Sequence, residues 1–279
     1  MAIKIVTDST SDIPAQLAKE LGITVVPLNV HFGDETYRDG LDIDSEQFFD
    51  WVTSGPIFPK TSQPSVGAFL EVYSNLLKGD DQIISIHASS KLSGTVNSAL
   101  QAQEQSGLGD RITVVDSMQV GIGLGVVVAA VAHDMRSGNS KEELVETAYR
   151  YADKARVYLL VETLEYLQRG GRIGKAQAFL GSILHVRPIL SLQDGEVHPL
   201  EKVRTRKKGI DRLYELASAH GSFQHMAVCS STTVDDAIQL EQSLTPFLAE
   251  GAKSFQTRFG PVVGTHVGPD AVGIAVLVS

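Results

Sequence analysis

The sequence has a single cysteine, no excess of positive charge and no apolar run long enough to cross a bilayer. Cys229 cannot form an internal disulfide, and the apolar run from Met226 to Cys229 predicts a buried thiol. The net charge of −9 argues against bulk binding of nucleic acid, which needs a basic face, and against docking on anionic membranes. The longest apolar stretch, Val120 to Ala132, is rich in glycine and alanine and predicts a buried helix rather than a membrane span.

Motifs for nucleotide and metal chemistry are also missing. There is no Gly-x-Ser-x-Gly elbow, no His-Glu-x-x-His pair and no second cysteine, so no metal is expected. A Walker loop needs a glycine separated by four residues from its Gly-Lys pair and a Ser or Thr after that pair, but Arg169 and Ala176 stand there. The run Gly121 to Gly125 does not match Gly-x-Gly-x-x-Gly. We therefore expect no nucleotide or metal cofactor and no kinase chemistry within this chain.

Hydroxyl-rich turns are what the sequence does contain. The stretch Ser89 to Ser98 follows an apolar strand at Gln82 to His87 and leads into a helix, where hydroxyls, free N–H groups and the helix dipole favour an anionic oxygen. The cluster Lys60 to Ser65 has the same pattern, and His266 lies in a predicted loop, Thr265 to Pro269. Each turn alone is typical of a helix cap. Together they predict one site for a ligand with a carboxylate or phosphate head.

The order of the elements predicts an α/β fold with two domains. Residues 1–155 alternate strand and helix, which favours a mostly parallel sheet with helices on both faces. The polar turns at residues 8–12, 61–65, 89–98 and 116–117 should then lie along a single sheet edge. Because Met1 to Val6 already reads as a strand, we expect no signal peptide and a cytoplasmic protein.

The second half, residues 156–279, has a different pattern. Asp194-Gly195 between two apolar runs is a strong hairpin signal, and the flanking helices favour an α+β domain with a mixed or antiparallel sheet. We place the domain boundary near residue 156. Within this scheme we expect a strand at Thr24 to Val30 and helices at Lys175 to Leu184 and Val234 to Ala249.

Two residue patterns leave other functions open. Ser93 could be a nucleophile with His266 or His87 as its base, which would make the protein a serine-dependent acyl esterase. A sugar-phosphate-binding protein is a third possibility. A basic run follows the second hairpin strand and is either a solvated face or a docking surface for a phosphate; it consists of Lys202, Arg204, Arg206, Lys207 and Lys208.

Several blocks of the sequence, in order along nearly the whole chain, resemble the DegV family of bacterial fatty-acid-binding proteins. They are Asp8-Ser-Thr, Lys60 to Ser65, Ser90 to Thr95 with Asn97 to Ala99, Leu164 to Leu167, Gly170 to Ile173, Arg187 to Leu190 and Thr265 to Pro269. The resemblance implies a non-catalytic carrier subunit of a fatty acid kinase. Such a subunit binds a long-chain fatty acid in a buried tunnel between domains and presents it to a separate ATP-dependent kinase subunit, and the acyl phosphate feeds lipid metabolism.

The resemblance also assigns site residues. It implies that Thr61 or Ser62, Ser93 and His266 hydrogen-bond the fatty acid carboxylate, that the amides of Gly94 and Thr95 lie beside it, and that Arg204 faces the kinase subunit or the transferred phosphate. Two positions depart from the family pattern. Asp270 stands where glycine is common and could bring a charge near the head group, and Val96 stands where an aromatic is common and could alter the acyl pocket.

Overall fold

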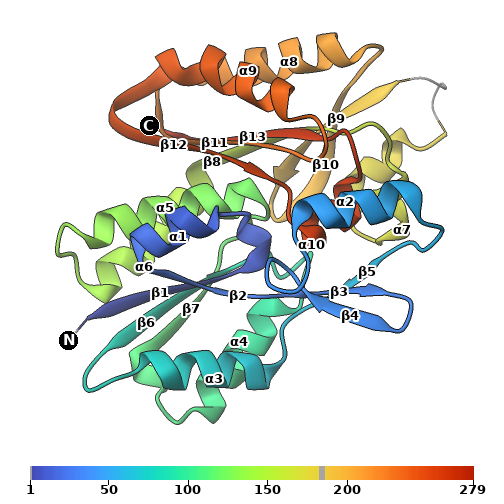
Figure 1. Ribbon diagram of the computed structural model, residues 1–279. Helices are drawn as coiled ribbons and strands as arrows, with labels where there is room; N and C mark the ends of the chain where they lie inside the picture. The colour runs from blue at the N-terminus through green and yellow to red at the C-terminus, as the bar shows by residue number, and fades with distance from the viewer. Residues whose placement is uncertain (1, 182–185) are drawn as a thin grey trace.

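The computed structural model describes residues 2–181 and 186–279, which form three β-sheets with helices packed between and around them (Figure 1). The first sheet has the order β2-β1-β6-β7, and all of its strands are parallel. Its strands are β1 (Ile3–Asp8), β2 (Ile23–Val26), β6 (Gln82–His87) and β7 (Ile112–Asp116). The predicted parallel sheet in the first half is confirmed.

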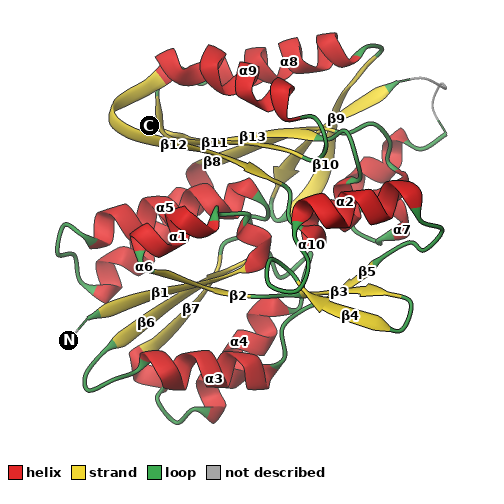
Figure 2. Cartoon of the chain, viewed as in Figure 1, coloured by secondary structure: helices red, strands yellow, loops and turns green. Residues whose placement is uncertain are grey.

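Helices cover both faces of this sheet (Figure 2). One face carries α3 (Val66–Leu76) and α4 (Thr95–Gln105), and the other carries α1 (Ala15–Leu21), α5 (Ile122–Met135) and α6 (Lys141–Lys154). Helix α6 starts at a capping box in which Ser140 and Glu143 satisfy each other's backbone N–H groups. The carboxyl ends of β1, β6 and β7 lead into the short helix η1 (Ser9–Ser11), α4 and α5.

The second sheet has six strands in the order β10-β9-β8-β13-β11-β12. Only β11 and β12 pair in parallel, so the sheet is mixed, as expected. Its strands are β8 (Ala155–Leu160), β9 (Arg187–Gln193), β10 (Glu196–Val203), β11 (Phe223–Ser230), β12 (Leu248–Arg258) and β13 (Val272–Val278). Helices α8 (Arg206–Ser218) and α9 (Val234–Leu244) cover its outer face (Figure 1).

Helix α5 lies between the two large sheets, which explains why every residue from Ile122 to Ala132 is buried. Two of its glycines allow this close packing. A Cβ atom on Gly123 would lie 2.5 Å from a methyl group of Val157, and one on Gly125 would lie 2.4 Å from the backbone oxygen of Ser11. The predicted buried helix is therefore the layer that joins the two halves of the chain.

A third, three-stranded sheet and three helices complete the fold beside the large sheets. The strands pair in the order β4-β3-β5. These elements are β3 (Asn29–Phe32), β4 (Glu35–Arg38), β5 (Lys60–Ser62), α2 (Ser45–Ser54), α7 (Glu165–Arg169) and α10 (Pro261–Val267). Helix α10 contacts α2, α7, β3 and β5, so it connects the end of the chain to segments from both halves.

Two expectations about the first half differ from the structure. The single strand expected at Thr24 to Val30 is two strands, β2 and β3, which belong to different sheets. Pro27 lies at the break, where it has no N–H to donate to a ladder. The polar turn at residues 61–65 begins within β5 of the small sheet, so it does not follow a strand of the parallel sheet, although Thr61 and Ser62 lie beside Thr10 and Ser93 at the carboxyl edge of that sheet.

Two expected helices in the second half also differ. At Lys175 to Leu184 the chain forms a short 3-10 helix, η3 (Gly174–Phe179), and residues 182–184 lie outside the described part of the chain. Helix α9 ends at Leu244, and a 3-10 turn containing Pro246, η4 (Thr245–Phe247), leads directly into β12. Proline at this turn ends the helix earlier than the apolar pattern suggested. A further 3-10 turn, η2 (Gly109–Arg111), precedes β7.

The proposed domain boundary near residue 156 falls in β8, the first strand of the six-stranded sheet. Because α5 packs on both sheets, the two halves share core residues, and their independence as domains stays a prediction. Within the described residues, no helix combines the length and hydropathy needed to cross a membrane.

Candidate functional site

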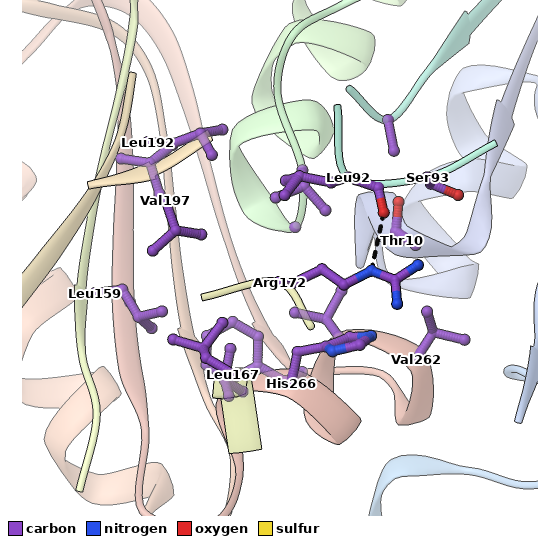
Figure 3. Close-up of a pocket in the computed structure, with 18 of the residues that line it drawn as sticks. Thr10, Leu92, Ser93, Leu159, Leu167, Arg172, Leu192, Val197, Val262 and His266 are labelled. Atoms are coloured by element: carbon purple, nitrogen blue, oxygen red, sulfur yellow. Dashed lines mark hydrogen bonds between the residues drawn. The ribbon is translucent and has the colours of Figure 1, made fainter. Parts of the chain in front are cut away.

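A cavity of about 120 Å³ lies between the carboxyl edge of the parallel sheet, the inner face of the six-stranded sheet and α10. Its two ends differ in chemistry (Figure 3). Leu159, Leu192 and Val197 lie at one end, whereas Thr10, Ser93 and the guanidinium of Arg172 lie at the other, with His266 between them. Thr61, Ser62 and Gln63 also line the cavity. The cavity therefore has an apolar part and a part rich in hydrogen-bond donors.

His266 lies in helix α10 rather than in the loop that the sequence suggested. Pro261 occupies the first turn of this helix, where a missing N–H costs nothing, and Gly268 at its end has a φ of 74°. The His266 Nε2 atom lies 3.1 Å from the hydroxyl oxygen of Thr61, which is 205 residues away in the chain. Burial, together with the positive charge of Arg172, lowers the pKa of His266 to about 4. The ring is therefore neutral at pH 7 and carries one N–H.

Glycines hold the backbone close to this ring. A Cβ atom on Gly170 would lie 2.1 Å from the His266 Nδ1 atom. On the opposite side of α10, a Cβ atom on Gly264 would lie 2.7 Å from the ring of Phe48. The Nδ1 atom is buried and has no hydrogen-bond partner within the described parts of the chain. Such an atom costs stability unless a ligand or water satisfies it.

Ser93 stands just before helix α4, at the carboxyl end of β6. Its hydroxyl lies 2.8 Å from that of Thr95, the first residue of the helix, and Gly94 is the N-cap. A Cβ atom on Gly94 would lie 3.0 Å from the Gln63 side-chain amide, so the turn packs closely on the segment after β5. Of the pair Thr61 and Ser62, only Thr61 contacts His266; the Ser62 hydroxyl lies 2.9 Å from His31 Nε2. The structure thus brings Thr61, Ser62, Ser93 and His266 to one cavity, whereas Gly94 and Thr95 do not line it.

Arg172 is a cavity residue that the sequence-based assignment missed. Its Nε donates to the backbone oxygen of Leu92 at 3.1 Å, and one terminal nitrogen donates to that of Gly170 at 2.8 Å. It is the one Arg or Lys among the described residues that line the cavity, and no Asp or Glu lines it. This arginine lies in the block Gly170 to Ile173, one of the blocks that carried the family resemblance. A cationic side chain in such a block was the available signal for a group that binds a carboxylate.

Arg204 does not line this cavity. It lies at a second, more open hollow of about 510 Å³, together with Arg187, Lys202 and Glu162. Arg187 forms an ion pair with Glu162 at 2.6 Å. The carboxylate site expected at His266 and the partner-facing or phosphate-facing position expected for Arg204 therefore lie in separate depressions.

The geometry does not assemble a serine nucleophile with its base. His266 contacts Thr61, and His87 lies fully buried between Asp8, 2.9 Å away, and Ser85, 2.6 Å away. Neither ring is hydrogen-bonded to Ser93, whose hydroxyl pairs with Thr95. The Asp8, His87 and Ser85 array resembles a triad in composition, but none of its side chains is exposed or lines the cavity.

The two departures from the family pattern do not reach the cavity. Asp270 has a φ of 58°, a conformation that favours glycine, and its carboxylate accepts a hydrogen bond from Thr232 at 2.6 Å. Val96 is buried in α4 but does not line the cavity. Within the described residues, no group of three or more His, Cys, Asp or Glu side chains could hold a metal ion.

Comparison with known proteins agrees with this architecture. A family model described as "Uncharacterised protein, DegV family COG1307" matches residues 2–279. The chain is 38% identical over 281 residues to a DegV domain-containing protein of Caldanaerobacter subterraneus subsp. tengcongensis, covering 98% of this chain and 97% of that protein.

Two solved structures are similar over the whole of both chains, each with 36% sequence identity. One, from Thermus thermophilus, has a TM-score of 0.91 and is described as fatty acid binding of a DegV family protein. The other, from Bacillus subtilis, has a TM-score of 0.88 and is described as DegV, a fatty acid binding protein. The present chain belongs to the DegV family.

Proposed function

We propose that this protein binds a long-chain fatty acid in the cavity, with the carboxylate at the end near Ser93 and Arg172 and the acyl chain against the six-stranded sheet. The observation that carries the proposal is the division of one cavity into a donor-rich end and an apolar end. A ligand that is anionic at one end and apolar along its length matches that division. Two structurally similar relatives are described as fatty acid binding.

The donor-rich end supplies hydrogen bonds and one positive charge. The hydroxyls of Thr61 and Ser93 and the neutral ring of His266 would donate to the carboxylate, while Gly94 and Thr95 at the start of α4 lie behind Ser93 and outside the cavity wall. Arg172 would balance its charge from the opposite wall. Because His266 is neutral, this arginine is the only full positive charge on the described walls of the cavity.

The acyl chain would supply most of the affinity. Burying about 15 methylenes at about 0.8 kcal/mol each offers on the order of 10 kcal/mol before ordering costs are subtracted. Head-group hydrogen bonds contribute about 1–3 kcal/mol each and would mainly set the orientation of the ligand. The strands that would hold the acyl chain are β8, β9 and β10, which contribute Leu159, Leu192 and Val197.

We further propose that the protein is a non-catalytic, cytoplasmic carrier that presents the carboxylate to a separate ATP-dependent kinase subunit. The lack of a nucleotide-binding motif supports an arrangement in which this chain binds the fatty acid and a separate chain binds ATP. The hollow at Arg204, with Arg187 and Lys202 beside it, is the proposed contact for the kinase subunit or for the transferred phosphate.

The first experiment asks which lipid the protein carries. Protein purified from a bacterial host and extracted under denaturing conditions should release long-chain fatty acid, identified by mass spectrometry. Thermal stabilisation by oleate or palmitate should accompany binding. Stabilisation by a phosphosugar with none by either fatty acid would contradict the proposal.

The second experiment separates retention of the acid from its presentation. With ATP and a fatty acid kinase catalytic subunit, the wild-type protein should support acyl phosphate formation, which hydroxylamine traps as a hydroxamate. The double variant Ser93→Ala and His266→Ala should lose this activity more than it loses bound acid, since the acyl chain holds most of the affinity. Equal hydroxamate yields from both proteins would show that the assigned residues do not present the carboxylate.

A further inference from the structure

Two buried carboxyl groups meet at the start of the helix that carries His266. Asp12 and Asp39 are 7% and 4% exposed. Asp12 Oδ1 accepts a hydrogen bond from the backbone N–H of Gly260 at 2.9 Å, and the Ser9 hydroxyl and the backbone N–H of Val262 face Asp39, where they favour its charged form. A Cβ atom on Gly260 would lie 2.9 Å from Asp12 Oδ1 and 3.2 Å from Asp39 Oδ1. Both carboxyls therefore approach the same point on the backbone.

This pair lacks a compensating cation. The Oδ2 atoms of both carboxyls are buried without a hydrogen-bond partner, and no Lys, Arg or His in the described chain forms an ion pair with either group. The other titratable groups that face the pair are acidic: Asp8 from β1 and the thiol of Cys229 from β11. Two buried carboxylates in such a place cannot both be ionised without a large cost.

The electrostatics agree with this geometry. Burial raises the pKa of Asp39 to about 7, with a further increase from the charge of Asp8. Burial also raises the pKa of Asp12 well above its usual value, and the charges of Asp39 and Asp8 add to the effect. Burial raises the pKa of the Cys229 thiol, which therefore stays neutral. Asp39 is therefore mostly protonated at pH 6 and becomes negatively charged as the pH rises through about 7.

The pair is coupled to the cavity through helix α10. The N–H groups that face the two carboxyls belong to Gly260 and Val262, at the first turn of α10, and the same helix places Val262, Val263 and His266 on the cavity wall. The helix has only seven residues, so a shift at its first turn moves the imidazole as well. A charge change at the carboxyl pair thus acts on the site without touching the ligand.

We propose that Asp12 and Asp39 are positioning residues: while Asp39 is protonated the pair fixes α10, and therefore His266, for an anionic ligand, and ionisation of Asp39 in alkaline solution weakens ligand binding. The binding part of this inference rests on the proposed function. The ligand carboxylate is ionised and His266 is neutral throughout the range from about pH 6 to about pH 8.5, so neither contributes to the change.

The test measures oleate affinity at about pH 6 and about pH 8.5. Wild-type protein should bind oleate about tenfold more weakly at the higher pH. Asp39→Asn keeps an oxygen for the Val262 N–H and cannot ionise, so its affinity should be the same at both values. Asp39→Ala removes that acceptor and should bind weakly at both. Asp42→Asn is the matched control, because Asp42 is exposed and paired with Arg38; it should follow the wild type.

A second readout does not need the ligand. The ring signal of His266 in the NMR spectrum of ligand-free protein, assigned with His266→Gln, should change with a midpoint near pH 7 in wild type and not in Asp39→Asn. If oleate binds at neither pH, the proposed function fails, while this ring transition would still support the positioning role. If oleate binds and neither its affinity nor the ring signal changes with pH, or if Asp39→Asn retains both changes, the positioning role is wrong. Asp12→Asn, expected to behave like Asp39→Asn, replaces it if that variant does not fold.

Discussion

At the scale of single residues, the donor-rich end of the cavity depends on backbone that approaches one imidazole without a side chain between them. Gly170 has ordinary helical geometry, with φ of −75°, so its importance is not conformational. The space for a Cβ atom is instead occupied by His266. This is a steric requirement, and it makes a sharp prediction.

Gly170→Ala should displace the His266 ring, because the new Cβ would lie 2.1 Å from Nδ1. Overpacking of this kind costs about 1–3 kcal/mol, which urea unfolding would measure, and oleate affinity should fall as well. Gly109→Ala is the control, since nothing lies within 4 Å of its Cβ position and its φ is not positive. Wild-type affinity and stability in Gly170→Ala would refute the proposed packing.

Arg172→Gln should weaken oleate binding by roughly 10- to 100-fold, because a charge-assisted interaction with the carboxylate contributes about 1.5–3 kcal/mol. Arg169→Gln is the matched control: Arg169 is exposed and pairs with Glu165 at the surface. Calorimetric titration with oleate would compare the two. Equal affinities for the two variants would mean that Arg172 only supports the backbone of Leu92 and Gly170.

At the scale of elements, the paired strands β9 and β10 decide how much space the acyl chain has. Val197 lies directly opposite Leu192 in the ladder, and both side chains line the cavity. Neighbouring residues on a strand point to opposite faces, so Glu196, which does not line the cavity, belongs to the other face. The apolar end can therefore be altered without touching the donors.

Val197→Phe should shift the preference toward shorter acids. Each methylene that no longer fits costs about 0.8 kcal/mol, so stearate should lose affinity while laurate keeps it. Competition between saturated acids of graded length, measured by mass spectrometry, would give the profile. Glu196→Gln should retain the wild-type profile. An unchanged profile for Val197→Phe would place the acyl chain elsewhere.

At the scale of the whole molecule, α5 joins the two sheets, and a pair of histidines lies on this junction. His133 of α5 stacks on His225 of β11 with ring centroids 5.5 Å apart. Burial lowers the pKa of His225 to about 4, and the positive charges of Lys253 and, when protonated, His133 add to the effect, while Asp134 opposes it. Protonation of this pair would place charge between packed layers.

The sign of the resulting pH dependence follows from linkage. The pKa of His225 is lower in the folded protein than in the unfolded chain, where it is about 6.5, so the unfolded chain binds more protons between about pH 6.5 and about pH 4. Stability should therefore fall as the pH is lowered through this range. On lowering the pH through this range, His225→Gln should lose less stability than wild type, as measured by urea unfolding. His31→Gln, which changes an unstacked ring in β3, should lose as much stability as wild type. Parallel curves for wild type and His225→Gln would contradict this account.

Local sequence signals determined most of the architecture. Alternating strands and helices predicted the parallel sheet, Asp194-Gly195 predicted the β9–β10 hairpin, and the apolar stretch at Val120 predicted the buried helix. Each of these patterns is contained in about ten residues, so it can be recognised without knowledge of the rest of the chain. The hydroxyl-rich turns were likewise recognisable as candidate anion sites, and Thr61, Ser93 and His266 do line one cavity.

Only the tertiary structure decided which of these groups meet. It placed β2 and β3 in different sheets on either side of Pro27, put His266 in a helix, brought Arg172 to the cavity and left Arg204 at another hollow. It also joined Asp12 and Asp39 at the start of α10. Contacts such as Thr61 with His266 link residues 205 positions apart. Their geometry depends on how layers pack, and packing is a property of the assembled core that no short stretch of sequence encodes.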